Sequence, residues 1–442
     1  MTRLVFHHNH QMLPPASENL LPVQLYGLSG QGRGDISVIG NPVVDKVKRL
    51  GVPIPGQVID FLTIALAVTA ADTFVRREDV EDGWTRLFSL QLPLHAPRRW
   101  LPLKKDLERA LHFLSGDIWD FEFQENGYPP PIPYRRRDRF HLIRLRGLDC
   151  VCLFSGGLDS AIGAIDLLAQ GRAPLLVSHA YKGDKTHQDK IAEALALNGR
   201  YSRFKVNADP HRSKEKIDAK EQPDITMRTR SLNFLAFAAV GACALRVISK
   251  QDRLDLIVPE NGFISLNAPL TLRRIGTLST RTSHPYFIES IQKIFDAADI
   301  PCCIINPYQF KTKGQMAAEC QNRQLLADIV DSTVSCSHWK RSNQQCGICV
   351  PCIIRRAALH AGGFSEEIDY TFNKVADVLK ETDRRDDLLA LSIAVAQKTN
   401  RKPGPWIADS GPLPPAQFMD YQEVFLRGLG EVEAFLKVED AL

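Results

Sequence analysis

One short run of residues, Leu-Phe-Ser-Gly-Gly-Leu-Asp-Ser at positions 153–160, constrains the fold of this chain more than any other feature. The apolar run from Val151 to Phe154 ends abruptly in two glycines, and an amphipathic segment with Ile162 and Ile165 follows. This pattern predicts a buried strand, a tight turn and the start of a helix. Glycine lets the backbone approach a ligand closely, and the first amide groups of a helix have no partner within it. The turn is therefore a predicted site for phosphate oxygens.

The composition is that of an ordinary globular chain. Its 442 residues are enough for two or three domains with cores of their own. Hydrophobic residues make up 44% of the sequence and charged residues 24%, and no apolar run approaches the roughly 20 residues that span a bilayer. The N-terminal residues lack the apolar stretch of a secretory signal. We therefore expect a cytoplasmic protein without membrane contact, and the net charge of +4 is too small to favour nucleic acid as a partner.

From residue 149 the pattern alternates between strands and helices. The predicted strands are Cys150–Phe154, Pro174–His179, Tyr201–Val206 and Asp255–Pro259, and the predicted helices are Ser160–Ala169, His187–Leu197, Arg230–Ile248 and Pro285–Ala298. Such alternation predicts the α/β class, with a doubly wound, mostly parallel sheet covered on both faces. Ligands of such sheets bind at the carboxyl ends of the strands, where the glycine turn lies.

The rest of the chain divides into segments of different composition. Residues 1–128 carry helical and strand-like patterns but no chemical motif, so we expect a separate N-terminal α+β domain. Residues 129–148 form a linker rich in proline and arginine. We expect the α/β domain over 149–335, a cysteine-rich segment over 336–363 and a helical tail over 364–442. The helical patterns of that tail cover Glu366–Glu381, Asp386–Thr399 and Pro415–Lys437.

Four cysteines have the spacing of metal ligands. Two residues separate Cys346 from Cys349 and Cys349 from Cys352, and Cys336 lies upstream. Two-residue gaps let successive thiolates reach one ion on tight turns, so four sulfurs predict a closed tetrahedral Zn²⁺ site, a zinc knuckle. An iron–sulfur cluster is the alternative. His338 lies between the first two cysteines, and we interpret it as a surface residue. The other cysteines lie in apolar runs and are interpreted as core residues.

The glycine turn and the cysteine cluster together resemble one known family. Ser-Gly-Gly-Leu-Asp-Ser at a first strand–helix turn, with four cysteines further on, is similar to the N-type ATP pyrophosphatases, which have a HUP-like fold and a PP-loop. More narrowly, residues 149–363 resemble the QueC family of 7-cyano-7-deazaguanine synthases. Further likeness lies in Val177–Tyr181 followed by His187, in Arg230–Phe234, and in Lys311–Lys313 after Pro307.

This resemblance implies an enzyme that binds ATP in the glycine loop, adenylates the carboxylate of a 7-deazapurine and releases pyrophosphate, after which a nitrogen nucleophile attacks. The implied cofactors are ATP, Mg²⁺ and the Zn²⁺ of the cysteine cluster. In such chemistry the protein mainly positions groups and neutralises charge. The residues implied to bind ATP are Ser155, Gly156, Gly157, Leu158, Asp159 and Ser160. The implied catalytic residues are Asp159, which would orient magnesium or the loop, and Lys182, Arg230, Lys311 and Lys313, which would offset negative charge. A solvated surface charge is the alternative for each lysine.

The chain departs from the QueC pattern where those synthases shape the pocket for base and carboxylate. It has Pro-Glu-Asn-Gly at 259–262 and Ser-Thr-Arg-Thr-Ser-His-Pro at 279–285 instead. Glu260 and Asn261 are candidates to bind a purine-like edge. Arg281 and His284 are candidates to bind a carboxylate or an acyl-adenylate, and an ordinary loop role is the alternative for these residues.

The shorter synthases lack the N-terminal domain and the helical tail. In its length, and in the Asn-Gly segment at 261–262 and the Ser-Thr-Arg-Thr-Ser-His-Pro segment at 279–285, the chain resembles the QueC-like proteins of bacterial anti-phage operons, especially the Qat system. That resemblance implies transfer of the activated carboxylate to an amine of a partner protein, a QatB-like component of the operon, docked on residues 1–128. Two alternatives stay open: ammonia as the nucleophile, which is the synthase reaction proper, and a non-catalytic nucleotide-binding scaffold of a defence complex. RNA thiolation is a weaker alternative, because the cysteines outside the cluster look buried and no basic RNA-binding domain stands out.

Overall fold

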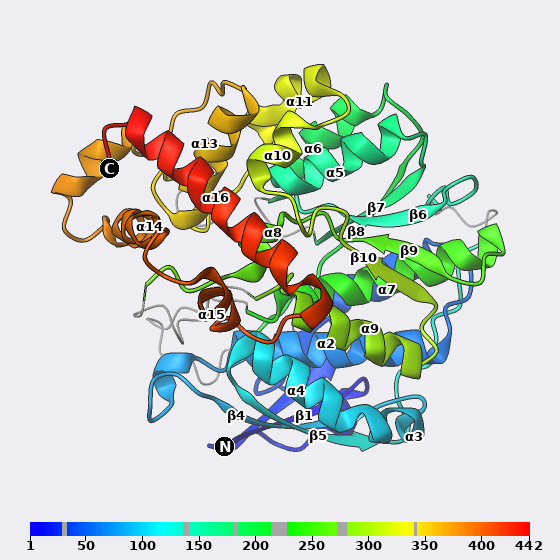
Figure 1. Cartoon of the computed structure of the whole chain (residues 1–442). Coiled ribbons are helices and arrows are strands. Elements are labelled where there is room, and N and C mark those ends of the chain that lie inside the picture. The colour runs from blue at the N-terminus through cyan, green and yellow to red at the C-terminus, as the bar shows by residue number, and fades with distance from the viewer. Residues whose placement is uncertain (29–32, 136–140, 180–183, 214–227, 272–280, 340–342) are drawn as a thin grey trace.

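A computed structural model describes residues 1–28, 33–135, 141–179, 184–213, 228–271, 281–339 and 343–442. It contains two five-stranded sheets, and every pair of neighbouring strands in both of them is parallel. Figure 1 shows these sheets as two layers, with helices between them and outside the second one. The α/β class that the sequence predicts is therefore confirmed.

The first sheet has the strand order β3-β2-β1-β4-β5. Its strands are β1 (Thr2–His7), β2 (Leu20–Leu25), β3 (Ser37–Ile39), β4 (Leu87–Pro93) and β5 (Ile118–Gln124), and its helices are α1 (Asn41–Lys48), α2 (Gly56–Phe74), α3 (Pro97–Trp100) and α4 (Lys104–Ser115). This parallel arrangement differs from the α+β arrangement that we expected for residues 1–128. The strand–helix alternation is hidden in the sequence because the connection from β1 to β2 holds only a 3₁₀ turn, His10–Met12.

The second sheet has the strand order β10-β9-β6-β7-β8 and is doubly wound. Its strands are β6 (Cys150–Leu153), β7 (Pro174–His179), β8 (Ser202–Val206), β9 (Leu254–Ile257) and β10 (Cys302–Ile305). Its helices are α5 (Leu158–Ala169), α6 (Asp184–Leu195), α7 (Arg230–Ser249), α8 (Gly262–Leu266), α9 (Pro285–Ala297), α10 (Lys313–Ala318) and α11 (Arg323–Ile329). The chain leaves the central strand β6 toward β7 on one side and later returns to β9 on the other. The carboxyl ends of β6 and β9 therefore form the switch point where such sheets bind ligands.

Both faces of the second sheet are buried, as the continuous apolar strands predict. In β6, Val151 and Leu153 belong to the core that contains α7, whereas Cys150 and Cys152 belong to the core on the α5 side. Successive side chains of a strand point to opposite faces, so one four-residue strand supplies two cores. This packing fixes the point at which the chain leaves the sheet and the glycine loop begins.

Helices α2 and α7 lie between the two sheets and pack against each other. Both are long and apolar enough to cross a membrane by length and composition alone, but 89% of the apolar window of α2 and 78% of that of α7 are buried inside the protein. Phe61 of α2 also meets Phe295 of α9, with ring centroids 5.0 Å apart. The two layers thus share one continuous hydrophobic core, although we expected the N-terminal region to have a core of its own.

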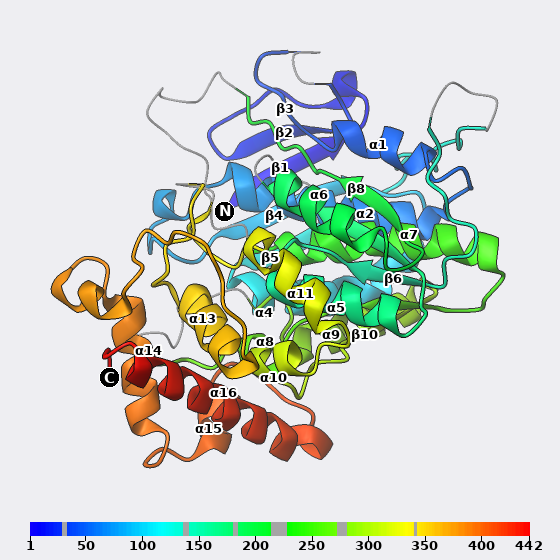
Figure 2. The same ribbon diagram turned by 90° about the horizontal axis from the view of Figure 1, so that it is seen from above.

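The C-terminal region contains α13 (Val350–Gly362), α14 (Asp386–Gln397), α15 (Pro403–Ala408) and α16 (Phe418–Val438). Helix α16 lies beside the other three at one side of the molecule (Figure 2). The helix expected over 366–381 is absent from this described segment, which holds only a 3₁₀ turn, Val375–Lys380. The amides of Thr371 and Phe372 instead donate to carbonyl oxygens of the cysteine loop, which draws this stretch away from a helical path.

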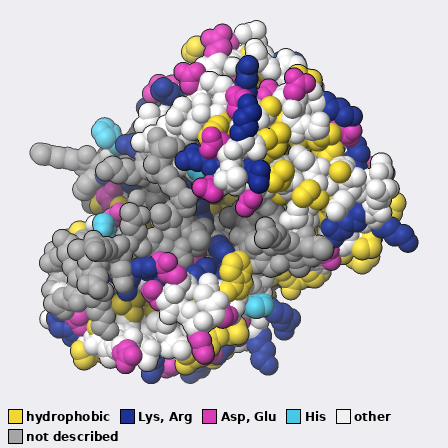
Figure 3. Space-filling view, turned by 90° about the vertical axis from the view of Figure 1, so that its left-hand side faces the viewer, with side chains coloured by type: hydrophobic (Ala, Val, Ile, Leu, Met, Phe, Trp, Pro, Cys, Tyr) yellow, Lys and Arg dark blue, Asp and Glu magenta, His cyan; other side chains and the backbone are white. Residues whose placement is uncertain are grey.

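Charged side chains are spread over the surface. On the face seen in Figure 3, basic and acidic side chains are interspersed, with hydrophobic ones between them. Exposed ion pairs such as Lys293–Glu289 and Arg253–Asp296, each with a nitrogen–oxygen distance of 2.7 Å, show the same mixing of signs. This mixing agrees with the small net charge of +4 and is typical of a solvated surface.

Candidate functional site

The glycine loop lies at the switch point of the second sheet, between the end of β6 and the start of α5. Gly156 has a φ of +88°, a left-handed conformation that a side chain disfavours, and a Cβ there would lie 3.0 Å from the Cγ of Gln188. Gly157 is the N-cap residue of α5, and no side chain caps this helix end. The first amides of α5 are therefore available to bind an anion.

Two serines shape the turn. The Ser160 hydroxyl accepts a hydrogen bond from the Gly156 amide at 3.1 Å and donates one to the Gly157 carbonyl at 2.9 Å. The Ser155 hydroxyl accepts from the Gly157 amide at 3.3 Å and lies 3.2 Å from that of Ser160. Ser160 is buried and Ser155 is exposed. Ser160 therefore holds the loop, whereas Ser155 can also reach a ligand at its mouth.

Asp159, on the first turn of α5, is the centre of a buried polar cluster. Its Oδ1 lies 2.7 Å from the Nζ of Lys313 on α10. Its Oδ2 accepts hydrogen bonds from the side-chain amide of Asn261 at 2.7 Å and from the backbone amide of Asn261 at 3.2 Å. All three side chains are buried. The fold thus joins residues that are far apart in the sequence at the N-terminus of one helix.

The pKa values of the two carboxyl groups in this cluster shift in opposite directions. Burial by itself raises the pKa of Asp159, but the Lys313 ammonium and the hydrogen bonds from Glu260, Lys313 and Asn261 together hold that pKa below its usual value. Burial raises the pKa of Glu260 well above its usual value, and the negative charge of Asp159 raises it further. The Asn261 side chain donates to the Oε1 of Glu260 at 3.2 Å. Of the two carboxyl groups, Glu260 therefore holds a proton more readily, whereas Asp159 pairs as a carboxylate with Lys313.

Among the other charged candidates, Lys311 lies in a separate groove. The Nζ of Lys311 is 2.7 Å from the Oε2 of Glu319, and both side chains line a groove of about 400 Å³ on the outer side of α5. The residues that line this groove include none from 155–160. Arg230 is the first residue of α7, and Lys182 falls outside the described residues. Lys313 is thus the predicted lysine that the structure brings to the loop.

Arg281 and His284 form a second group with Phe113 of α4. Arg281 donates to the Phe113 carbonyl at 3.2 Å, and its guanidinium lies 4.7 Å from the centroid of the Phe113 ring. The His284 ring lies 4.9 Å from that of Phe113, and its Nε2 is 3.3 Å from the Oγ of Ser410. His284 also caps α9, because its Nδ1 accepts from the Tyr286 amide at 3.2 Å. These contacts tie the first sheet, the second sheet and the tail together.

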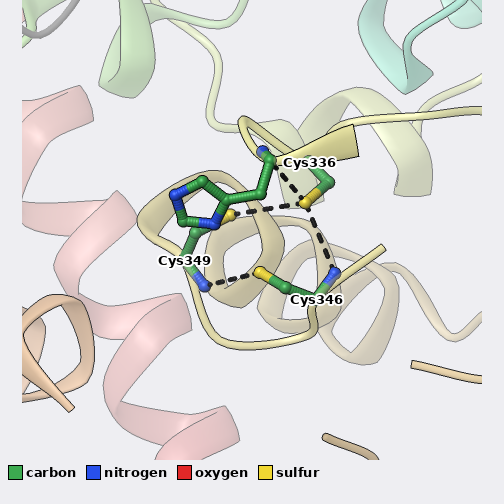
Figure 4. A group of neighbouring side chains, drawn as sticks. Cys336, Cys346 and Cys349 are labelled. Atoms are coloured by element: carbon green, nitrogen blue, oxygen red, sulfur yellow. Dashed lines mark hydrogen bonds between the residues drawn. The ribbon is translucent and has the colours of Figure 1, made fainter. Parts of the chain in front are cut away.

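The four predicted cysteines do converge, and Figure 4 shows three of them, Cys336, Cys346 and Cys349. The Sγ of Cys346 lies 3.9 Å from that of Cys352, and the Sγ of Cys349 lies 4.0 Å from that of Cys336. With Zn–S bonds of about 2.3 Å, two sulfurs of a tetrahedral site are about 3.8 Å apart, so the thiols fit Zn²⁺. The amides of Cys346 and Cys349 each donate to a cluster sulfur at 3.3 Å, as expected for a thiolate-rich knuckle. The cluster can hold a metal ion.

His338 is closer to this cluster than the sequence indicates. Its side chain is exposed, as expected, but a ring nitrogen lies within 4.8 Å of the sulfurs of Cys336, Cys346 and Cys349. A ligand set of three cysteines and one histidine is also a common zinc site. His338 is therefore an alternative fourth ligand to Cys352.

Two residues that sequence reasoning missed also touch the glycine loop. The buried Gln188 of α6 donates its side-chain amide to the Ser155 carbonyl at 3.1 Å. The amide of Val334, just upstream of the cysteine cluster, donates to the Gly156 carbonyl at 3.0 Å. Neither residue belongs to a motif, because a helix interior and a backbone amide leave no recognisable pattern. The position of Gln188 beside His187, which the resemblance already marked, is the one signal that could have pointed to it.

The loop, the helix N-terminus and the paired lysine form a candidate anion site in a doubly wound α/β protein, with a cysteine cluster beside it that can hold a metal ion. Residues 282–363 match the family model described as queuosine biosynthesis protein QueC, so this part of the chain is QueC-like. The matched stretch contains Lys311, Lys313 and the four cysteines, whereas the glycine loop lies outside it. No curated protein and no solved structure matches the chain.

Proposed function

We propose that the chain is an ATP-dependent synthase or ligase that adenylates the carboxylate of a 7-deazapurine and passes it to a nitrogen nucleophile. The observation that carries the proposal is the Asp159–Lys313 pair, 2.7 Å long and buried, at the uncapped N-terminus that follows the glycine loop. The QueC-like stretch that contributes Lys313 supports an activity that uses ATP. The 7-deazapurine comes from the sequence resemblance to the QueC synthases.

In the first step, a carboxylate oxygen attacks the α-phosphorus of ATP, and the bond to the departing pyrophosphate breaks. The amides at the start of α5 and the Ser155 hydroxyl are placed to bind phosphate oxygens, and Lys313 offsets the charge that accumulates on the leaving group. The Asp159 carboxylate is a hard oxygen ligand of the kind that holds Mg²⁺, which neutralises phosphate charge when it is bound. The raised pKa of Glu260 favours a carboxyl that donates a hydrogen bond, and we propose that it binds a purine-like acceptor at the same edge.

In the second step, nitrogen attacks the acyl carbon, a C–N bond forms and AMP leaves with the bonding electrons. The nucleophile that we propose is an amine of a partner protein in anti-phage defence, a QatB-like component, because the first sheet and the helical tail lie outside the QueC-like stretch. Ammonia is the alternative nucleophile. Arg281 and His284 are the substrate residues of this proposal. Both lie against Phe113 of α4.

Pyrophosphate release from ATP in the presence of 7-carboxy-7-deazaguanine tests the first step. We expect the wild-type protein to release pyrophosphate and Lys313→Met to lower the rate by about 100-fold, because a buried charge next to the leaving group is lost. Lys293→Met is the matched control, since its side chain is 72% exposed on α9. Absence of release by wild-type protein, with and without the operon partner, would contradict the proposal.

A non-catalytic nucleotide-binding scaffold is the second candidate. It is favoured by the way Lys313 and Asn261 already occupy both carboxylate oxygens of Asp159 within the chain itself. Asp159→Ala separates the two functions. An enzyme should lose pyrophosphate release and defence but keep its partner, whereas a scaffold should keep defence with this variant.

A further inference from the structure

The C-terminal helix α16 packs across the segments that carry the Asp159 cluster. It contacts α8, which directly follows Asn261, and α10, which begins at Lys313 (Figures 1 and 2). It lies outside the QueC-like stretch of residues 282–363. Arg427 and Glu431, which bind the segment around the start of α10, lie one turn apart on this helix.

Glu431 of α16 binds the first turn of α10. Its Oε2 accepts a hydrogen bond from the Gly314 amide at 3.1 Å, and its Oε1 accepts one from the Thr312 hydroxyl. Thr312 and Gly314 flank Lys313 on both sides. A Cβ at Gly314 would lie 2.5 Å from the Oε1 of Glu431, so a side chain at this position would displace the carboxylate. Burial raises the pKa of Glu431, and the hydrogen bonds from Thr312 and Gly314 oppose that effect.

Arg427, one turn earlier on α16, binds the same segment. Its Nη2 donates to the Phe310 carbonyl at 2.8 Å, and its Nε donates to the Oε1 of Gln315 at 3.3 Å. That oxygen also accepts from the Thr312 amide at 3.0 Å, which completes a capping box at the start of α10. Both neighbours of Lys313 are therefore fixed from α16.

The same helix supports the other side of the cluster. The Phe425 ring lies 5.8 Å from that of Phe263 in α8, and Val424 comes within 3.2 Å of a Cβ placed at Gly262. Asn261, which binds Asp159, is the N-cap residue of α8. Helix α16 thus braces both segments that converge on Asp159.

We propose that Glu431 is a positioning residue that places the Lys313 ammonium at Asp159 by binding the first turn of α10. The consequence for ATP rests on the function proposed above. Lysine carries its charge on a flexible four-carbon stem, so its place depends on the backbone from which it starts. Lys313 itself is buried, and its ammonium has to meet Asp159 at the end of the glycine loop. The C-terminal helix therefore completes the site.

A double-mutant cycle on ATP affinity, measured by calorimetry, tests this role. Glu431→Ala should raise the dissociation constant of ATP about tenfold in the wild-type background, but less than about twofold in the Lys313→Met background, because the two residues act as one unit. Glu431→Gln should restore binding, since its amide can accept from Gly314 and donate to Thr312. Glu433→Ala is the matched control, because Glu433 pairs with Lys398 and Lys437 instead. Equal effects of Glu431→Ala in both backgrounds would overturn the proposal.

Acylation of the Lys313 amine, followed by peptide mass spectrometry, separates this inference from the proposed function because it needs no nucleotide. Lys313 is 5% exposed, so its labelling should be slow in wild-type protein, several-fold faster in Glu431→Ala and unchanged in Glu433→Ala. A wild-type protein that binds no ATP but shows this pattern would refute the proposed function and keep the positioning role. Equal labelling in all variants would refute the positioning role. If Glu431→Ala does not fold, Gly314→Ala, which pushes the same carboxylate away, takes its place.

Discussion

The amide of Val334 donates a hydrogen bond to the carbonyl oxygen of Gly156, with 3.0 Å between nitrogen and oxygen. Val334 lies two residues before Cys336, so the segment that leads into the cysteine cluster holds the glycine loop directly. In the same segment, the Ser332 carbonyl accepts a hydrogen bond from the His187 ring. That ring also packs edge-on against the Trp339 ring, with 4.7 Å between the two centroids. The geometry of the glycine loop therefore depends on the segment that carries the cysteine cluster.

Loss of the metal should weaken nucleotide binding. Cys346→Ser removes one of the converging thiolates, and metal binding commonly supplies about 10 kcal/mol of folding free energy to such knuckles. We expect the variant to lose its zinc, measured by elemental analysis, and to bind ATP about tenfold more weakly, because the Val334–Gly156 contact is released. Cys303→Ser on the edge strand β10 is the control. Unchanged ATP affinity in a zinc-free protein would show that the two sites are independent.

The conformation of Gly156 should matter for binding beyond its effect on stability. An alanine at this φ of +88° costs about 1–2 kcal/mol of folding free energy, and its Cβ would meet Gln188 at 3.0 Å. Gly171→Ala is a matched control, because Gly171 has a φ of +73° in open surroundings. Both variants should melt at lower temperature than the wild type, but only Gly156→Ala should lose ATP affinity. Equal affinities in the two variants would argue against phosphate binding at the loop.

The parts of the site that were predictable from the sequence are local. The strand, the glycine turn and the helix follow one another within residues 150–169, and two-residue gaps bring cysteines together whatever the rest of the fold does. The pairing of Asp159 with Lys313 was not predictable, because it depends on where α10 packs, 154 positions further along the chain. Lys311 and Lys313 look alike in the sequence, and only the packing of α10 sends one inward and the other to the outer groove.

The sequence of helix α2 carries a signal for the contact between the two layers. Helix α2 is apolar on all sides, and nearly every residue from Val58 to Phe74 is buried. A helix of that kind has to be covered all round, which a small separate domain with one sheet cannot do. The placement of Arg281 and His284 against α4 follows from this contact between the layers, and no local pattern encodes it.

Asp72 should be a main link between the layers. Its Oδ1 pairs with Arg86 at 2.6 Å, and its Oδ2 accepts from the amide and the hydroxyl of Thr229, which precedes α7. Asp72→Ala removes a carboxylate that neutralises the buried Arg86 guanidinium. We therefore expect a loss of about 3–5 kcal/mol in the free energy of unfolding. Asp79→Ala, whose carboxylate is half exposed, should cost less than about 1 kcal/mol. Urea unfolding should show a single transition, and two transitions would contradict the shared core.

His284 should make stability depend on pH in the acid range. Burial and, to a smaller extent, the charge of Arg281 lower its pKa to about 3, whereas the unfolded chain titrates at about 6.5. Between these values the unfolded state binds the extra proton, so this contribution to stability is full above pH 6.5 and is lost as the pH falls toward 3. His284→Asn keeps an acceptor for the Tyr286 amide but does not titrate. The stability advantage of wild-type protein over this variant, measured by urea unfolding, should therefore shrink by about 2 kcal/mol between pH 7 and pH 5. A constant difference would mean that the imidazole takes up its proton without leaving its place between Phe113 and Ser410.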